Sequence, residues 1–208
     1  MIRVLLADDH TLVREGLRQL LGATADIRVE GEAATGDEAL ALVKADDYDL
    51  AVLDLSMPGL SGIELIKRLR LEKPRLRVLV LSMHGEQQYA VRALKAGASG
   101  YLTKDSASAQ LVGVIRKVAG GGMHISEAAA AQLVGAVGDG DALPHTRLSD
   151  REFEVFRLLV AGVGPTGIAE RLHLSVKTVS THKTRILEKM GMESVAGLVR
   201  YAVEKKLS

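Results

Sequence analysis

Five short apolar runs alternate with helical segments through the first 120 residues, and this alternation constrains the fold more than any other feature. The runs are rich in Val, Leu and Ile and lie at 2–7, 28–33, 50–55, 77–82 and 100–104. The segments with helical periodicity lie between or after them, near 12–22, 36–46, 61–72, 86–96 and 106–119. Strands that alternate with helices build a parallel sheet that is covered by helices on both faces. The pattern therefore predicts a doubly wound (βα)5 domain of the α/β class.

Two breaker-rich stretches divide the rest of the chain. Residues 120–122 are three glycines, and residues 138–144 read GDGDALP. Such stretches end regular structure. Between them, residues 126–137 contain strong helix formers. The predicted organisation is a first domain at 1–122, a linker at 123–145 that contains a helix, and a second domain at 146–208.

The second domain has helical signals and no strand signal. Ser149 and Glu152 form the pattern of a capping box at the start of a helix. A short helix at 165–172, a turn at 173–175, a longer helix at 176–190 and a last helix near 194–205 follow, and Gly191 is a stop signal. This order predicts an all-α domain built around a helix-turn-helix.

Composition excludes several classes of protein. The 208 residues include no cysteine, which excludes disulfides, thiolate metal sites and cysteine nucleophiles. The first residues lack the layout of a signal peptide, and no apolar run is long enough to span a membrane. We therefore expect a soluble cytoplasmic protein that does not contact a membrane.

The balance of charged residues is informative over a short stretch of the chain, but not over either half as a whole. Residues 1–122 contain 16 Lys and Arg against 16 Asp and Glu, and residues 123–208 contain 11 against 10. From Arg171 to Lys189, however, five basic residues stand against one acid, Glu188. Such a local excess of positive charge suits contact with phosphates.

Acidic residues follow two of the predicted strands. Asp8 and Asp9 follow the first strand, and Asp54 lies at the end of the third. The carboxyl ends of parallel strands meet at one edge of the sheet, where ligands bind. Several carboxylates gathered there repel one another unless a cation offsets them, and an oxygen-only set suits Mg²⁺. Lys104 adds a positive charge and Ser82 a hydroxyl at the same edge.

These residues give residues 1–122 a resemblance to the receiver domain of response regulators. The matching motifs are the acidic pair Asp8–Asp9, LDLSMPGLSG around Asp54, LSMHGE after Ser82 and GYLTKDS around Lys104. The chain departs from many receivers in having Asp105, where they have proline. The resemblance implies that a sensor histidine kinase phosphorylates Asp54.

The resemblance also implies roles for the other residues of the site. Mg²⁺, or Mn²⁺ in its place, would be held by Asp8, Asp9, Asp54 and the backbone carbonyl of Ser56. Ser82 and Lys104 would bind the phosphoryl group, and Tyr101 would turn in response to it. The domain would thus be a phosphoacceptor with no catalytic residues acting on another substrate.

The helix predicted at 176–190 has two unlike faces. The 3.6-residue period places Val176, Val179, Ile186, Leu187 and Met190 on one face. It places Lys177, Ser180, Thr181, Thr184 and Arg185 on the other. Lys183 falls on the apolar side, where its stem could pack and its ammonium reach outward. A helix with such a polar, basic face can enter a major groove.

Residues 146–208 resemble the LuxR-type DNA-binding domain of NarL/FixJ response regulators. The matching segments are LSDREFEVFRLLVAG and IAERLHLSVKTVSTHKTRILEKMGM. The implied partners are an operator in double-stranded DNA and, on activation, a second copy of the chain. The implied contacts are Lys177, Thr178, Ser180, Thr181, His182, Thr184 and Arg185. Pro165, Thr166 and Gly167 replace the family's usual Asn-Lys-Glu, which removes a basic residue.

Other functions fit less well. Phosphatases that form an aspartyl phosphate need a second Asp two positions later, where this chain has Ser56. No Gly-rich phosphate loop follows the first strand, as a nucleotide-binding fold would require. Two alternatives stay open. The first domain could be receiver-like and act without phosphorylation, and the helical domain could serve protein contacts alone.

Overall fold

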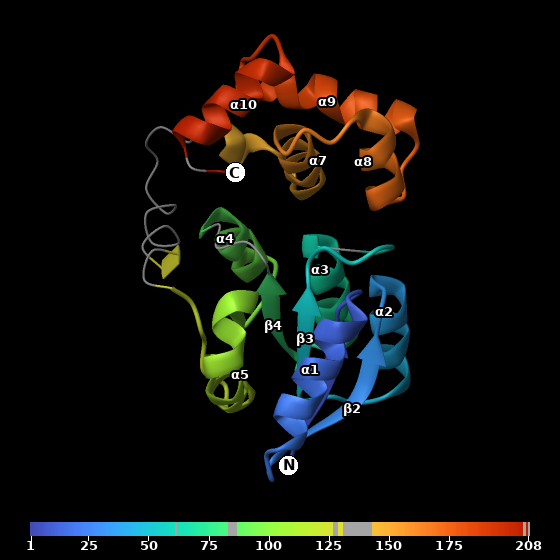
Figure 1. The fold of residues 1–208 in the computed structure, drawn as a ribbon, viewed down its shortest axis with the longest axis vertical. Coiled ribbons are helices and arrows are strands. Elements are labelled where there is room, and N and C mark those ends of the chain that lie inside the picture. Colours follow the sequence, from blue (N-terminus) through green and yellow to red (C-terminus); the bar gives the residue numbers. More distant parts are fainter. Residues whose placement is uncertain (61, 83–86, 127–128, 131–142, 206, 208) are drawn as a thin grey trace. The chain divides into compact units, whose positions relative to one another are not determined.

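The computed structural model describes residues 1–60, 62–82, 87–126, 129–130, 143–205 and 207. The chain divides into two compact units, Met1–Val137 and Gly138–Ser208. Figure 1 shows a sheet wrapped by helices in the first unit and a group of helices in the second. Each unit is described by itself.

The first unit contains a five-stranded parallel sheet. Its strands are β1 (Ile2–Ala7), β2 (Ile27–Ala33), β3 (Leu50–Asp54), β4 (Arg77–Ser82) and β5 (Gly100–Thr103). The strand order is β2-β1-β3-β4-β5. β1 pairs with β3 from Val4↔Leu50 to Ala7↔Leu53, so their carboxyl ends lie together at one edge.

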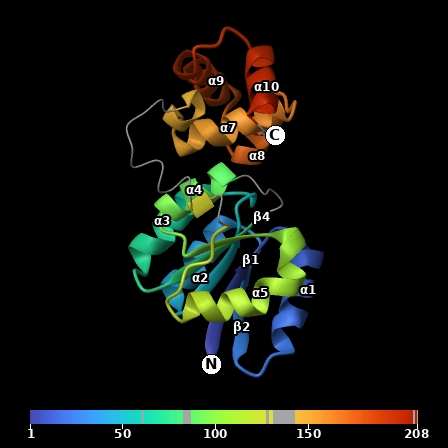
Figure 2. The same ribbon diagram turned by 90° about the vertical axis from the view of Figure 1, so that its left-hand side faces the viewer.

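Five helices cover the two faces of this sheet. They are α1 (Thr11–Gly22), α2 (Gly36–Ala45), α3 (Gly62–Glu72), α4 (Gln87–Lys95) and α5 (Lys104–Ala119). One core cluster joins Leu21 of α1, Leu111 and Ile115 of α5, and the strand residues Val52 and Leu79. Helices α1 and α5 therefore cover the same face (Figure 2). Strands β1, β3, β4 and β5 are mostly buried, as expected when helices cover both faces, whereas the charged residues of the edge strand β2 are exposed.

The doubly wound fold predicted from the sequence is confirmed, with small differences at element ends. Each strand begins and ends within one residue of its predicted bounds. Lys104 was predicted to end the fifth strand, but it begins α5, because the extended backbone ends at Thr103. Most of the helix predicted at 126–137 lies outside the described residues.

The second unit is helical throughout the part that the structure describes. It contains the 3-10 helix η1 (Pro144–Arg147) and the α-helices α7 (Asp150–Val160), α8 (Pro165–Leu172), α9 (Val176–Met190) and α10 (Val195–Glu204). Its core includes Phe153, Phe156, Ile168, Ile186 and Leu198, all at most 1% exposed. The rings of Phe153 and Phe156 stack, with centroids 5.9 Å apart. Helices α8 and α9 and the turn between them form the predicted helix-turn-helix.

Local sequence signals place the ends of these helices. The Ser149 hydroxyl accepts from the Glu152 amide, and the Glu152 carboxylate accepts from the Ser149 amide, which confirms the predicted capping box. Pro165 is the first residue of α8, where its missing N–H costs no hydrogen bond. Gly191 ends α9 in the left-handed conformation that favours glycine.

In the described part of the chain, no helix has the length and apolar character needed to cross a membrane.

Candidate functional site

Two buried carboxylates lie at the carboxyl edge of the sheet. Asp8 follows β1 directly and Asp54 is the last residue of β3, and each is only 3% exposed. The pairing of β1 with β3 brings them together although they are far apart in sequence. Burying two charged carboxylates side by side is costly unless positive charge compensates them. This edge is therefore built for a cation or a cationic side chain.

Lys104 supplies part of that positive charge. Its Nζ lies 2.8 Å from Oδ2 of Asp54 and 2.6 Å from Oδ2 of Asp8. Burial acts to lower the pKa of Lys104, but its contacts with Asp54 and Asp8 outweigh burial and raise the pKa above its ordinary value. Lys104 is thus a permanent cation between the two carboxylates.

Asp9 and His10 extend the cluster towards solvent. Nδ1 of His10 lies 2.9 Å from Oδ1 of Asp9 and 3.2 Å from Oδ1 of Asp8. Asp8, Asp9, His10 and Asp54 each offer one ligand atom, and these atoms all lie within 4.8 Å of one another. Unlike Asp8 and Asp54, both Asp9 and His10 are exposed.

The donor set fits a hard divalent cation. Three of the four residues offer carboxylate oxygens, which Mg²⁺ prefers. Oδ2 of Asp8 is buried, and although Lys104 lies close to it, no described donor makes a hydrogen bond of good geometry to this oxygen. A buried oxygen that lacks a hydrogen bond of good geometry is expected beside a cation or a catalytic centre. The predicted ligands Asp8, Asp9 and Asp54 therefore lie together.

Three further predicted residues lie near this edge. Ser82 ends β4, one position beyond the residue that pairs with Asp54, and it is buried. Tyr101 lies on β5 opposite Val80 of β4, and it is also buried. The backbone N–H of Ser56 donates to Oδ1 of Asp54 at 3.1 Å, which holds the loop after β3 close to that carboxylate.

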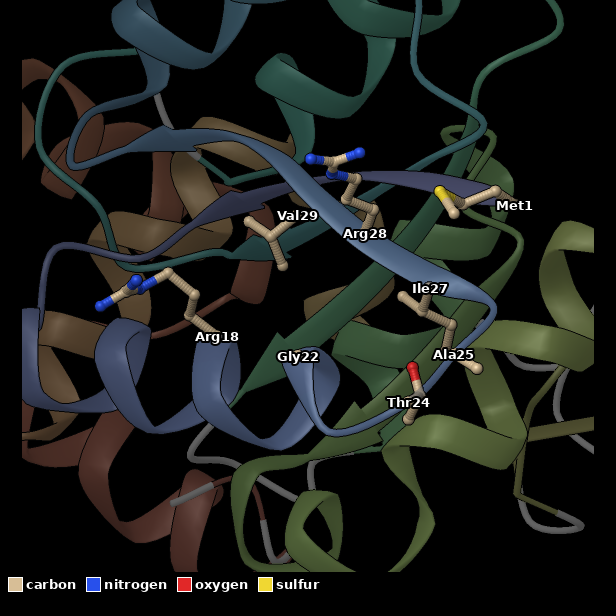
Figure 3. A pocket seen from close by; sticks show the side chains of 8 residues that line it. All are labelled: Met1, Arg18, Gly22, Thr24, Ala25, Ile27, Arg28 and Val29. Carbon is tan, nitrogen blue, oxygen red and sulfur yellow. The ribbon is translucent and has the colours of Figure 1, made fainter.

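A separate hollow lies at the opposite edge of the sheet. It is formed by the end of α1 and the start of β2, and Figure 3 shows its side chains. Its lining residues are Met1, Arg18, Gly22, Thr24, Ala25, Ile27, Arg28 and Val29. They include two arginines and no carboxylate, so this hollow is not part of the acidic site.

In the second unit, most of the polar side chains predicted on α9 face outward. Lys177, Ser180, Thr181, Thr184 and Arg185 are all exposed, whereas Val179, Ile186 and Met190 are buried. Val176 was predicted on the apolar face, but it is 45% exposed, because the first turn of α9 projects beyond the core. The exposed face is thus polar and basic, with Val176 at its start.

Two of the predicted DNA contacts are less accessible. Thr178 is half-buried in the first turn of α9, where its amide donates to the hydroxyl of the N-cap residue Ser175 at 3.0 Å. His182 is half-buried, and no described group makes a hydrogen bond to its buried Nδ1. Burial lowers the pKa of His182; the charge of Glu152 opposes this, and the charges of Arg151 and Arg185 add to it. The lowered pKa favours the neutral imidazole.

Lys189 is exposed, but it pairs with a buried residue of its own unit. Its Nζ donates to Oε2 of Glu152 at 2.6 Å, and Glu152 is buried in the first turn of α7. The neighbouring Arg151 donates to the carbonyl of Leu172, the last residue of α8. The first turn of α7 thus ties both helices of the helix-turn-helix, so Lys189 is engaged within the unit.

Several of these contacts were not foreseen from the sequence. His10 stands directly after the acidic pair, which was a signal that it could join the cluster. Arg14, one turn into α1, donates to the carbonyl of Asp8 at 2.6 Å. The partners of Lys189 and Arg151 left no local signal, because these contacts cross 37 and 21 residues of sequence.

Comparison with known proteins assigns a family to each unit. Residues 4–116 match the family described as response regulator receiver domain. Residues 146–202 match the family described as bacterial regulatory proteins, luxR family. The first match lies in the sheet-containing unit and the second in the helical unit.

Known proteins also match over nearly the whole chain. The oxygen regulatory protein NreC of Staphylococcus carnosus is 36% identical, and the match covers 99% of each chain. Response regulator UvrY of Escherichia coli K12 is 32% identical over 100% of this chain and 96% of its own. The structure of the two-component response regulator RcsB in complex with DNA aligns with a TM-score of 0.61 and 29% identity, covering 97% of this chain and 98% of the other. The chain therefore belongs to the NarL/FixJ family of two-component response regulators, in which a receiver domain is joined to a LuxR-type DNA-binding domain.

Proposed function

We propose that the receiver, residues 1–122, accepts a phosphoryl group on Asp54 from a sensor histidine kinase. The observation that carries this proposal is the meeting of buried Asp8 and Asp54 with Lys104 at the carboxyl edge of the sheet. In this proposal residues 123–145 are the linker and residues 146–208 the DNA-binding domain. The end of α5 at Ala119 and the start of η1 at Pro144 support these boundaries.

The reaction is the transfer of a phosphoryl group between two side chains. A carboxylate oxygen of Asp54 attacks the phosphorus in line with the phosphorus–nitrogen bond of the kinase phosphohistidine. The new oxygen–phosphorus bond forms as that bond breaks, and the departing imidazole takes a proton from solvent. The Ser56 amide and the Lys104 ammonium orient the two oxygens of Asp54 for this attack.

Residues of the same edge would hold the divalent cation. Asp8, Asp9, Asp54 and the Ser56 carbonyl are the proposed ligands for Mg²⁺, or for Mn²⁺ in its place. When bound, the cation neutralises negative charge that develops on the phosphoryl oxygens. Lys104 supplies a second positive charge on the buried side of the site.

The phosphorylated state differs from the free state in what Lys104 and Ser82 contact. After transfer, the Lys104 ammonium and the Ser82 hydroxyl bind phosphoryl oxygens. The movement of Ser82 towards the phosphoryl group makes room for Tyr101 to turn inward, so phosphorylation changes the populations of two receiver conformations. The burial of Ser82 at the end of β4 supports its part in this switch, whereas Tyr101 is already buried in this structure.

The output is binding to an operator in double-stranded DNA as a homodimer. The exposed face of α9 supplies the contacts, with Ser180 and Thr181 nearest the base edges and Lys177 and Arg185 on phosphates. Thr178, His182 and Thr184 complete the proposed set of contacts. The DNA complex of the related RcsB supports this output.

The test is the intact mass of the full chain after incubation with a small-molecule phosphodonor and Mg²⁺. We expect one phosphoryl adduct on wild type and none on Asp54→Asn. Asp47→Asn is the matched control, because Asp47 is an exposed aspartate of the same unit and should leave the adduct in place.

Binding to duplex DNA and dimerisation are then compared for the same samples. Stronger binding and dimer formation by the phosphorylated wild type alone would support the proposal. Identical binding and dimerisation by Asp54→Asn and phosphorylated wild type would contradict it. That result would favour a transcription regulator that acts without phosphorylation.

A further inference from the structure

We propose that His10 supplies a nitrogen ligand at the divalent-cation site and shifts its preference from Mg²⁺ towards Mn²⁺. This inference rests on the proposed function, because it concerns the cation that would bind beside Asp54. It assigns to this chain a ligand other than the carboxylates and the backbone carbonyl already named.

The position of His10 is the first argument. Its Nδ1 lies 2.9 Å from Oδ1 of Asp9 and 3.2 Å from Oδ1 of Asp8. His10 and the three aspartates Asp8, Asp9 and Asp54 each offer one potential ligand atom. These four atoms all lie within 4.8 Å of one another. The imidazole nitrogen therefore lies among the carboxylate oxygens that would hold the cation.

The backbone holds His10 in this position. Its amide donates to Oδ1 of Asp8 at 2.9 Å, and its carbonyl accepts from the Arg14 amide in the first turn of α1. Arg14 also donates to the carbonyl of Asp8. The backbone of His10 is thus tied to a proposed ligand, whereas its side chain is 62% exposed and has room to turn.

Buried Asp8 is the second, independent observation that points to a cation. Its Oδ2 is buried 2.6 Å from Nζ of Lys104, but it receives no hydrogen bond of good geometry from any described donor. Oδ1 of the same carboxylate accepts from the His10 amide. One carboxylate therefore presents an oxygen to the site and, with its other oxygen, holds His10 beside it.

The chemistry of the ligands gives the direction of the preference. Mg²⁺ selects oxygen ligands in a rigid octahedron and keeps several waters, so a neighbouring imidazole adds little to its binding. Imidazole nitrogen suits first-row transition metals, and carboxylates and waters suit Mn²⁺. A site with three carboxylates and one imidazole therefore favours Mn²⁺ more than the same site without the imidazole.

The test measures the bound ion directly. Full-length protein is prepared with ¹⁵N-labelled histidine and titrated with Mn²⁺, and Mg²⁺ affinity is obtained by competition. Pulsed electron paramagnetic resonance then detects coupling between bound Mn²⁺ and a histidine nitrogen. The variant is His10→Gln, and the control is His124→Gln, a histidine of the same unit remote from the cluster in sequence.

We expect histidine coupling in wild type and in His124→Gln, and its loss in His10→Gln. Removing even an outer-shell partner of a metal ligand costs about 10–100-fold in affinity. The ratio of Mn²⁺ to Mg²⁺ affinity should therefore fall by at least about tenfold in His10→Gln.

Two results would overturn the inference, and they differ in meaning. In the first, wild type binds both ions without histidine coupling, and the ratio of Mn²⁺ to Mg²⁺ affinity is unchanged in His10→Gln. His10 would then not be a ligand, although the proposed cation site would still be supported. In the second, neither ion binds wild type, or binding does not depend on Asp54. The proposed cation site itself would then be wrong.

Discussion

The ammonium of Lys104 lies 2.8 Å from the carboxylate of Asp54, a residue that stands 50 positions earlier in the chain. The same ammonium lies 2.6 Å from Asp8, so two buried carboxylates share one cation. Lys104 therefore compensates part of the charge of these carboxylates before any other cation binds, and it places a positive charge beside the proposed site of phosphorylation.

Replacing Lys104 with Met is expected to destabilise the receiver and to increase its response to Mg²⁺. Removing one partner of a buried ion pair leaves uncompensated charge and costs about 3 kcal/mol. Hydrogen exchange of the β3 and β4 amides measures this loss, and added Mg²⁺ should restore more stability to the variant than to wild type. Lys95→Met, at an exposed lysine of α4, should change stability by no more than about 0.5 kcal/mol. Equal effects of the two substitutions would contradict the role of Lys104.

The exposed face of α9 predicts which basic residues contribute to the salt dependence of DNA binding. Arg185→Gln and Lys177→Gln should each reduce the slope of log affinity against log salt by about 1, the value for one lost phosphate contact. Lys189→Gln should leave the slope unchanged, because its ammonium is paired with Glu152. Binding to mixed-sequence duplex DNA at several salt concentrations measures the slope. A reduced slope in Lys189→Gln, with no change in the other two, would reverse our assignment of the DNA face.

Glu152 should make the stability of the DNA-binding domain depend on pH in the acid range. Burial acts to raise the pKa of Glu152, but hydrogen bonds from Lys189 and Ser149 outweigh burial and hold the pKa below its ordinary value of 4.5. A lowered pKa in the folded state means that Glu152 stabilises the domain above pH 4.5, and that this stabilisation is lost as pH falls through the lowered value.

The substitution Glu152→Gln tests this dependence. At pH 7 the variant should lose about 2 kcal/mol, the scale of a hydrogen bond to a charged group. The difference from wild type should shrink as pH falls below 4.5, measured by hydrogen exchange of α7 amides. Glu188→Gln, at an exposed position of α9, is the control. A difference that is the same at pH 7 and pH 3 would show that charge is not the cause.

His173 should be a position where glycine stabilises the helix-turn-helix. It ends α8 at φ 51° and ψ 47°, a left-handed conformation that costs a residue with a Cβ about 1 kcal/mol. His173→Gly should therefore raise the free energy of unfolding by up to about 1 kcal/mol, measured by hydrogen exchange of α8 and α9 amides. Glu170→Gly, inside α8, should instead lower it by about 1 kcal/mol. Destabilisation by both substitutions would mean that the His173 side chain contributes more than its backbone conformation costs.

The elements of this protein could be predicted because their signals are local. The apolar runs at β1 and β3 predict buried parallel strands, and the Ser149 capping box and Gly191 predict helix ends from neighbouring residues. The acidic site could also be predicted in outline, because the carboxyl ends of parallel strands meet at one edge. The ends of the fourth and fifth predicted strands also brought Ser82 and Lys104 to this edge, whereas only the resemblance to receivers singled out Tyr101.

What only the tertiary structure decided is which of these residues contact one another. The sequence by itself determined the order of strands and helices, their approximate ends and the acidic edge, because hydrophobic periodicity and helix caps act over a few residues. It did not determine that Lys189 pairs with Glu152, that Val176 is exposed, or that His10 joins the carboxylates. Those outcomes depend on how folded elements pack, and packing brings together side chains whose distance in sequence carries no signal.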